Sequence, residues 1–195
     1  MKEGAHGGTM GSPVIVACLG DSITEGSPGE TTWQEWAAHP ALEYRNSGVW
    51  GERTDEIADR FDVALAGADA LIVQGGINDI AQGRPVEQAA ENLCTMVRRG
   101  KQLGLQVVLV NVLPWNGGGD AAEARIRRLN ELIAELAQSE RVPLLDFWSA
   151  LDDPDAPGRM KAEYAHADGD HPSVAGYRKI GESALDDLLR ALQPP

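Results

Sequence analysis

The chain has few cysteines, little positive charge and no long apolar run. Its 195 residues carry 30 acidic side chains against 17 Lys and Arg, which gives a formal net charge of −13. Such an acidic surface argues against binding to nucleic acid or to an anionic membrane, because both need a basic footprint. No apolar run approaches the length that spans a bilayer, so we expect no membrane insertion. The two cysteines, Cys18 and Cys94, lie in apolar stretches and are expected to be small core residues in a reducing compartment.

The chain also lacks an internal repeat and any linker long enough to divide it. Its length suits one domain of ordinary size, which we expect over residues 13–195. Residues 1–12 are polar, rich in glycine and without an apolar signal core. We therefore expect a flexible leader and a cytoplasmic protein. The sequence leaves the oligomeric state open.

Five short runs of apolar or alternating residues predict strands. They span residues 14–19, 42–45, 70–73, 107–110 and 142–145. The first, third and fourth runs are apolar throughout, which predicts strands buried on both faces. The second run alternates apolar and polar residues, and the fifth contains a proline, so both are typical of strands at the edge of a sheet.

Helical patterns and polar loops separate these runs. The expected helices are one that carries Trp33 and Trp36 and is capped by Thr31 or Thr32, one from Thr54 or Asp55, one over 85–101, one capped by Asp120, and a last one from about Tyr177 to Gln193. The expected loops span 26–29, 46–53, 113–119 and 152–155. Strands that alternate with helices predict a three-layer α/β/α fold with a parallel sheet. The burial pattern of the five strands favours the flavodoxin-like order 2-1-3-4-5.

Chemically reactive side chains follow the first and last strands. Ser22 comes directly after the first strand, at the sheet edge where open α/β folds bind their ligands. A serine needs an adjacent base to act as a nucleophile at neutral pH. His171 precedes Pro172, which keeps it extended and outside the next helix, and Asp168 can bend back to orient its imidazole. If this histidine must be neutral to act, activity falls as the pH drops through the ordinary titration range of histidine.

Acyl transfer also needs hydrogen-bond donors where negative charge develops on the substrate oxygen. Three groups are suited to this role: the Ser22 amide, a glycine amide in the loop over 48–51, and the Asn78 side chain. Each of these stretches alone is a common turn or cap. Their placement behind successive strands, at one expected crevice, is what favours a catalytic site.

These residues resemble the motifs of the SGNH hydrolases, also called GDSL esterases, along essentially the whole chain. Gly20-Asp21-Ser22 matches the first block, Asn46 to Thr54 resembles the second, Gly76-Ile77-Asn78-Asp79 matches the third and Asp168-Gly169-Asp170-His171 matches the fifth. The pattern Asn-x-x-x-x-Gly in the second block favours Gly51 over Gly48 as the oxyanion glycine. Ser22 lacks the Gly-x-Ser-x-Gly elbow, which argues against the ordinary α/β-hydrolase fold.

The resemblance implies a serine esterase that needs no cofactor and no metal. It implies Ser22, His171 and Asp168 as nucleophile, base and acid, with Gly51, Asn78 and the Ser22 amide as oxyanion donors. We expect a small, neutral, short-acyl ester as substrate, with Asp21, Pro114 and Trp115 in contact with it. The short loops after the strands offer one apolar wall, residues 113–115, and little material for a deep tunnel. The family also includes carbohydrate acetylesterases, acyl thioesterases and lysophospholipases, which stay open as alternatives.

Two further alternatives come from outside the family. Four side chains, His166, Asp168, Asp170 and His171, form a dense cluster that could bind a metal and support a metal-dependent hydrolase. Sensitivity to a chelator would distinguish this from a serine hydrolase. A flavodoxin-like sheet also serves nucleotide-binding or flavin-binding modules. Against that, the glycines at 117–119 follow the fourth strand, and no phosphate-binding glycine-rich loop follows the first.

Overall fold

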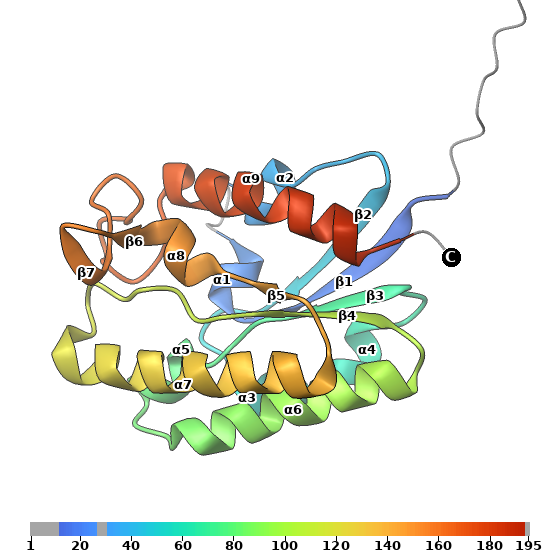
Figure 1. The fold of residues 1–195 in the computed structure, drawn as a ribbon, viewed down its shortest axis with the longest axis horizontal. Coiled ribbons are helices and arrows are strands. Elements are labelled where there is room, and N and C mark those ends of the chain that lie inside the picture. The colour runs from blue at the N-terminus through green and yellow to red at the C-terminus, as the bar shows by residue number, and fades with distance from the viewer. Residues whose placement is uncertain (1–11, 27–30, 194–195) are drawn as a thin grey trace, which may run out of the picture.

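The computed structural model describes residues 12–26 and 31–193. At its centre lies a five-stranded parallel sheet in the order β2-β1-β3-β4-β5, as the burial pattern predicts (Figure 1). The strands are β1 (Val14–Gly20), β2 (Leu42–Gly48), β3 (Ala70–Val73), β4 (Gln106–Val110) and β5 (Leu144–Leu145). Residues 1–11 of the expected leader and 27–29 of the expected first loop lie outside the described residues.

Helices cover both faces of this sheet (Figure 1). They are α1 (Ser22–Glu25), α2 (Trp33–Trp36), α3 (Thr54–Asp59), α4 (Phe61–Ala64), α5 (Ile77–Ala81), α6 (Val86–Gln102), α7 (Gly119–Glu140), α8 (Phe147–Leu151) and α9 (Val174–Ala191). The cap at Thr32, the start of α3 at Thr54 and the span of α6 agree with the sequence-based expectations, whereas α9 begins at Val174, before the first expected helical residue.

Successive side chains of β1 point to opposite faces, so the strand contributes to two separate cores. Ala17 and Leu19 belong to the core that also contains buried residues of α6 and α7. Val16 and Cys18 belong to the core under α2, α8 and α9. Because both faces are covered, β1 must be apolar along its length, and its polar residues come only where the strand ends.

Strand β2 is longer than the sequence suggests. The residues expected to open a loop, Asn46 to Gly48, continue the parallel ladder and pair with Cys18 to Gly20 of β1. The backbone bonds of the long β1 strand override the polar character of these residues. Strand β5 is shorter than expected and begins only at Leu144, after Pro143, which has no N–H to donate.

Two further expectations are wrong. Asp120 does not cap α7, which begins one residue earlier with Gly118 at the N-cap; the Asp120 carboxylate lies 3.4 Å from Arg159 instead. The acidic stretch 152–155 is not a plain loop, because α8 leads into a small antiparallel hairpin, β6 (Asp152–Asp153) with β7 (Ala156–Met160). The Asp152 carboxylate accepts a hydrogen bond from the Gly158 N–H and so closes this hairpin.

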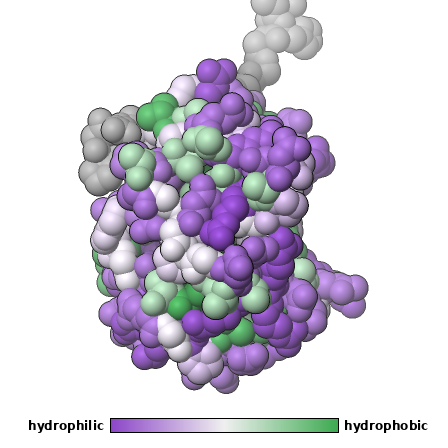
Figure 2. All heavy atoms as spheres, turned by 90° about the vertical axis from the view of Figure 1, so that its left-hand side faces the viewer, coloured by the Kyte–Doolittle hydropathy of each residue, from purple (hydrophilic) through white to green (hydrophobic). Residues whose placement is uncertain are grey.

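The strands run toward the left-hand side of Figure 1, and their carboxyl ends therefore meet on that side. In Figure 2 this side faces the viewer, and apolar residues are scattered among hydrophilic ones. None of the helices in the described part of the chain is long and apolar enough to cross a membrane.

Candidate active site

Ser22 lies at the carboxyl end of β1, where the chain turns directly into the single-turn helix α1. The Asp21 side chain caps this helix by accepting a hydrogen bond from the Ile23 N–H at 2.9 Å. Gln74, just past the end of β3, accepts hydrogen bonds from the Asp21 N–H and from the Thr24 hydroxyl. These contacts hold the serine in a fixed turn, with 4% of its surface exposed.

His171 and Asp168 complete a chain of hydrogen bonds that starts at Ser22. The Ser22 Oγ atom lies 3.0 Å from His171 Nε2, and His171 Nδ1 lies 2.9 Å from Asp168 Oδ2. With the Nδ1 proton directed to the carboxylate, Nε2 is free to accept the serine proton. A serine, a base and an orienting acid in this order are the arrangement that nucleophilic catalysis requires.

The Asp168 carboxylate is stabilised in its charged form. Burial raises the pKa of Asp168, but hydrogen bonds from the Asp170 N–H and from His171 outweigh this effect and hold the pKa well below its usual range. Its Oδ1 atom accepts the N–H groups of Asp170 and His171 at 2.9 and 3.1 Å. Asp168 is therefore ionised at every pH at which an imidazole titrates, as an orienting acid must be.

The three residues expected to donate to an oxyanion, Ser22, Gly51 and Asn78, line one cavity. Among the described residues, neither the Ser22 N–H nor the Gly51 N–H has an acceptor. Gly51 has φ of +76°, a left-handed conformation that favours glycine, and it lines the same cavity as Ser22. The Gly48 N–H, by contrast, donates to the Asn46 side chain at 2.9 Å. This geometry favours Gly51 over Gly48 as the oxyanion glycine.

Asn78, the third donor, is fixed to the loop that carries Gly51. It lies in the first turn of α5, and its Nδ2 group donates to the Glu52 carbonyl at 2.9 Å, which leaves the second N–H of the amide available. The neighbouring Asp79 is buried and accepts two hydrogen bonds from Thr54, one from its N–H and one from its hydroxyl. Asp79 thus joins α5 to the start of α3.

An ion pair anchors the same loop to the strand that precedes Ser22. The Arg60 guanidinium contacts the Glu52 carboxylate at 2.6 to 3.0 Å. It also donates to the carbonyls of Ser47 at 2.9 Å and Gly20 at 3.3 Å. One side chain therefore ties the Gly51 loop to the ends of both β1 and β2.

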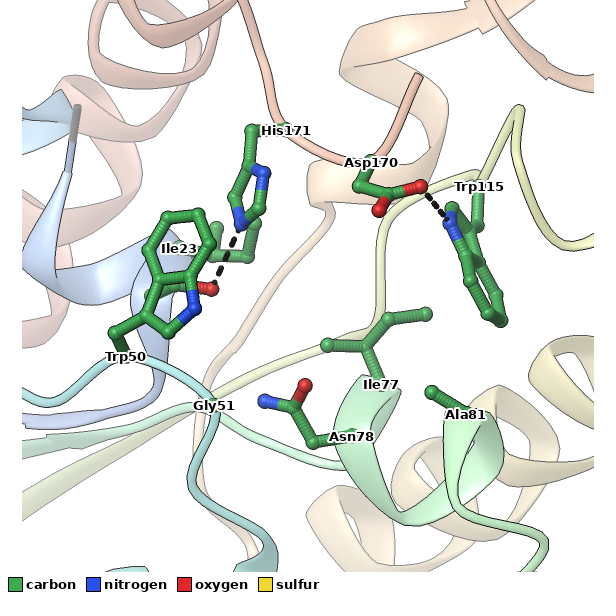
Figure 3. Close-up of a pocket in the computed structure, with 10 residues that line it drawn as sticks. Ile23, Trp50, Gly51, Ile77, Asn78, Ala81, Trp115, Asp170 and His171 are labelled. Carbon is green, nitrogen blue, oxygen red and sulfur yellow. Dashed lines mark hydrogen bonds between the residues drawn. The ribbon is translucent and has the colours of Figure 1, made fainter. Parts of the chain in front are cut away.

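Ser22 lies in the wall of a cavity of about 170 Å³ (Figure 3). Its lining consists of Ser22, Ile23, Trp50, Gly51, Ile77, Asn78, Ala81, Trp115, Asp170 and His171. Trp115 is one of these residues, and its expected contact with substrate stays a prediction. Asp21, which caps α1, and Pro114 are buried and do not line this cavity, and their expected contact with substrate stays a prediction.

The side chains of the histidine-acid cluster point to different partners. Asp168 lies between His171 and His166, whose Nδ1 atom is 3.2 Å from Asp168 Oδ2, while the Asp170 side chain turns away and accepts a hydrogen bond from Trp115 Nε1 at 2.5 Å. Within residues 12–26 and 31–193, no three His, Cys, Asp or Glu side chains are arranged to hold a metal ion. The residues of this stretch are thus used in other contacts.

Sequence reasoning did not place several lining residues at the substrate pocket, of which Trp50 and Asp170 are the most distinctive. The Trp50 indole stacks on the His171 imidazole with ring centroids 4.3 Å apart and planes at 25°. Both residues are immediate neighbours of predicted site residues, Gly51 and His171, and that adjacency is the only signal that could have found them. Ile77 and Ala81 were missed because α5 is too short to show helical periodicity.

Comparison with known proteins places this fold and site in a family. Residues 18–179 match the GDSL-like Lipase/Acylhydrolase family. The chain belongs to this family. It is therefore a carboxylic ester hydrolase of the GDSL group, a class of serine hydrolases.

Individual relatives of this GDSL hydrolase are distant. An arylesterase of Vibrio mimicus is 25% identical over 185 residues, which cover 89% of this chain and 88% of the relative. A multidomain esterase of Ruminococcus flavefaciens is 28% identical over 127 residues, 62% of this chain, and the match spans only 15% of that much longer protein. The fold is similar to that of a member of the lipolytic G-D-S-L family from Veillonella parvula, with a TM-score of 0.79 and 22% identity over 92% of this chain and all of the other.

Proposed function

We propose that this GDSL hydrolase cleaves small, neutral, short-acyl esters through an acyl-enzyme formed on Ser22. The observation that carries the proposal is the unbroken chain from Ser22 Oγ to His171 and Asp168, with contacts of 3.0 and 2.9 Å. Ser22 and His171 line a cavity together with Gly51. The backbone N–H groups of Ser22 and Gly51 are without acceptors among the described residues.

In the acylation step, Ser22 Oγ attacks the ester carbonyl carbon while its proton passes to His171 Nε2. The carbonyl oxygen gains negative charge and is stabilised by the Ser22 and Gly51 N–H groups and by the Asn78 amide. When the tetrahedral intermediate collapses, the bond to the leaving oxygen breaks and that oxygen takes the proton from His171. Asp168 stays charged throughout and stabilises the imidazolium form of the histidine.

In the deacylation step, water repeats the sequence in place of serine. His171 Nε2 takes a proton from water, the resulting nucleophile attacks the acyl carbon, and the Ser22 oxygen leaves with the proton returned by the histidine. The products are the carboxylic acid and the regenerated hydroxyl of Ser22. No atom or electron is required from any other group.

The cavity supports a short acyl group and a neutral substrate. Its volume of about 170 Å³ lies below the roughly 300–1,000 Å³ of sites that enclose a drug-sized ligand. Its walls combine apolar side chains, Ile23, Ile77 and Ala81, with Asp170 as the lining carboxylate. The Asp170 carboxylate would repel an anionic acyl or alcohol group, whereas a neutral ester carries no charge for it to repel.

A series of p-nitrophenyl esters tests the proposal, and the aryl leaving group is in keeping with the arylesterase relative. We expect acetate and butyrate to give the highest kcat/KM, with a steep fall beyond about eight carbons, because further methylenes, each worth about 0.8 kcal/mol when buried, find no cavity. Ser22→Ala is the control and should abolish turnover. Palmitate above butyrate would contradict the short-acyl preference, and full activity of Ser22→Ala would reject the mechanism.

A parallel screen separates the family alternatives. An acetylated sugar and an acyl thioester, each assayed against the butyrate ester, identify a carbohydrate acetylesterase or a thioesterase if either substrate gives the higher kcat/KM. A lysophospholipid added to the same screen tests the lysophospholipase alternative.

A further inference from the structure

The Trp50 side chain is unusual among the large apolar residues of this protein. Trp50 is 56% exposed, so the hydrophobic core does not account for its position. It nevertheless lies flat on the His171 imidazole, with centroids 4.3 Å apart and planes at 25° (Figure 3). An exposed tryptophan held against the half-buried His171 ring, rather than in solvent or in the core, indicates a role at that ring.

The backbone around Trp50 is anchored on both sides. Before it, the Val49 N–H donates to the Gly20 carbonyl at 3.1 Å. After it, the Glu52 carbonyl accepts from Asn78 and the Glu52 carboxylate binds Arg60. The indole is therefore presented from a fixed segment of the chain, and the same segment carries the Gly51 donor.

The stack restrains His171 in a direction that its hydrogen bonds do not. The contacts to Ser22 and Asp168 act at the edge of the imidazole, through Nε2 and Nδ1. They fix the two ends of the ring but leave it able to rock about the line that joins them. Asp168 itself lies on an exposed loop, with 36% of its side chain accessible. Contact with an aromatic face removes this rocking freedom and keeps water off one side of the ring.

We propose that Trp50 is a positioning residue for the histidine base, which rests on the proposed function of Ser22 and His171. The indole holds the imidazole in line with Ser22 Oγ, and its electron-rich face favours the imidazolium that forms when the serine or water proton reaches Nε2. Trp50 itself gains and loses no proton. Its effect falls on acylation and deacylation alike, because both steps pass through the same imidazolium.

A residue that only formed a wall for substrate would behave differently. Its loss would change KM, and the change would depend on the ester used. Loss of a positioning residue lowers kcat for all esters by a similar factor and leaves KM close to its original value. Trp115 lines the same cavity and, among the described residues, makes no ring contact with His171, so it provides the matched comparison.

The kinetic test compares Trp50→Leu, Trp50→Phe and Trp115→Leu on p-nitrophenyl acetate, butyrate and octanoate. We expect Trp50→Leu to lower kcat by about 10-fold on all three esters. Trp50→Phe, which keeps an aromatic face, should recover most of this loss. Trp115→Leu should instead change the relative KM values of the three esters. Unchanged kcat in Trp50→Leu, or a loss confined to one ester, would overturn the positioning role.

A second readout detects the stack without turnover. A protonated imidazole quenches the fluorescence of an indole in contact with it, so the emission of Trp50 should fall in a step when the protein is acidified. The difference between wild type and Trp50→Phe isolates this step from the other four tryptophans, and His171→Gln should remove it. Absence of the step would show that the rings are not in contact in solution and would overturn the proposal. If wild type hydrolyses no ester, the proposed function and the positioning role fall together, while the step would still report the ring contact.

Discussion

The ion pair between Arg60 and Glu52 gives a prediction whose size can be worked out from the structure. Arg60→Met keeps the length of the side chain but removes every donor to Glu52, Ser47 and Gly20. The Glu52 carboxylate is then left without its cation, next to Gly51 and Asn78, the two proposed oxyanion donors. We expect both the free energy of unfolding and kcat to fall, for separate reasons.

Breaking a fully buried ion pair by removing one partner costs about 3–5 kcal/mol. The Arg60 and Glu52 side chains are 28% and 18% exposed, so water takes over part of the lost interaction. We therefore expect Arg60→Met to lower the free energy of unfolding by about 2 kcal/mol, below the fully buried range. For a protein of this size, that corresponds to a drop of about 4–8 °C in Tm.

The catalytic effect comes from the loop between β2 and α3. A displacement of about 1 Å in a catalytic group can cost about 10²-fold in rate. We expect kcat to fall by about 10- to 100-fold, with KM nearly unchanged, because the oxyanion donors act mainly in the transition state. Glu52→Gln should show the same pattern, and the double variant should be less than additive.

Urea denaturation and p-nitrophenyl butyrate hydrolysis measure the two effects. Arg128→Met is the matched control, because Arg128 pairs with Glu131 on the surface of α7 at 3.0 Å with both side chains largely exposed. Its loss should change stability by less than about 0.5 kcal/mol and leave kcat unaltered. If Arg60→Met proves as stable and as active as Arg128→Met, the ion pair does not hold the loop, and the reasoning is refuted.

Three other predictions concern the oxyanion donor, a buried acid and metal dependence. Asn78→Ala should lower kcat by about 10²–10³-fold with little change in KM, and an unchanged kcat would leave Asn78 only its structural bond to Glu52. Burial raises the pKa of Asp21 from 3.8 to about 6, so the folded state binds more protons than the unfolded state between these values and loses stability as the pH rises through them. Asp21→Asn removes this penalty and should be more stable than wild type at pH 8 by up to about 3 kcal/mol, at about 1.4 kcal/mol per pH unit of pKa shift. At pH 4 the two proteins should be equally stable. Urea denaturation curves that show the same difference in stability at both pH values would contradict this prediction. EDTA should leave ester hydrolysis unchanged, whereas loss of activity that zinc restores would favour a metal-dependent enzyme.

The parts of the fold that could be predicted from the sequence are those that long-range burial imposes on local composition. Strands β1, β3 and β4 are covered on both faces and must be apolar throughout, and the two edge strands need not be. That contrast alone predicts the strand order, and the structure confirms it. The long helices α6 and α9 were readable for a similar reason, because each buries one face against the sheet.

The elements that the sequence did not predict are short and depend on contacts between residues that are distant in sequence. Helices α1 and α5 have four and five residues, too few for a periodic pattern. α5 begins after Gly76 with φ of +118° and is joined to α3 by Asp79. The stretch from Asn46 to Gly48 has the composition of a loop and becomes a strand only because β1 is there to pair with it.

The residues of the candidate site also separate into those that the sequence predicts and those that it does not. Ser22, Asn78, Asp168 and His171 could be predicted because their positions behind successive strands carry the chemical information. In the structure Ser22, Asn78 and His171 line one cavity and Asp168 contacts His171 from behind, while their catalytic roles stay predictions. Trp50 could not be predicted, since its stack on His171 joins two loops with no pattern in common. Asp21 caps α1 and does not line the cavity, a position that the sequence could not distinguish from one in contact with substrate.

The most direct test of the account is covalent labelling of the serine. A fluorophosphonate probe should add to wild-type protein, and mass spectrometry of the digest should place the adduct on Ser22 and on no other residue. His171→Gln should slow this labelling strongly, because the proton of the Ser22 hydroxyl then has no acceptor at 3.0 Å. An adduct on a different residue, or Ser22→Ala protein that still hydrolyses butyrate esters at the wild-type rate, would contradict the central claim.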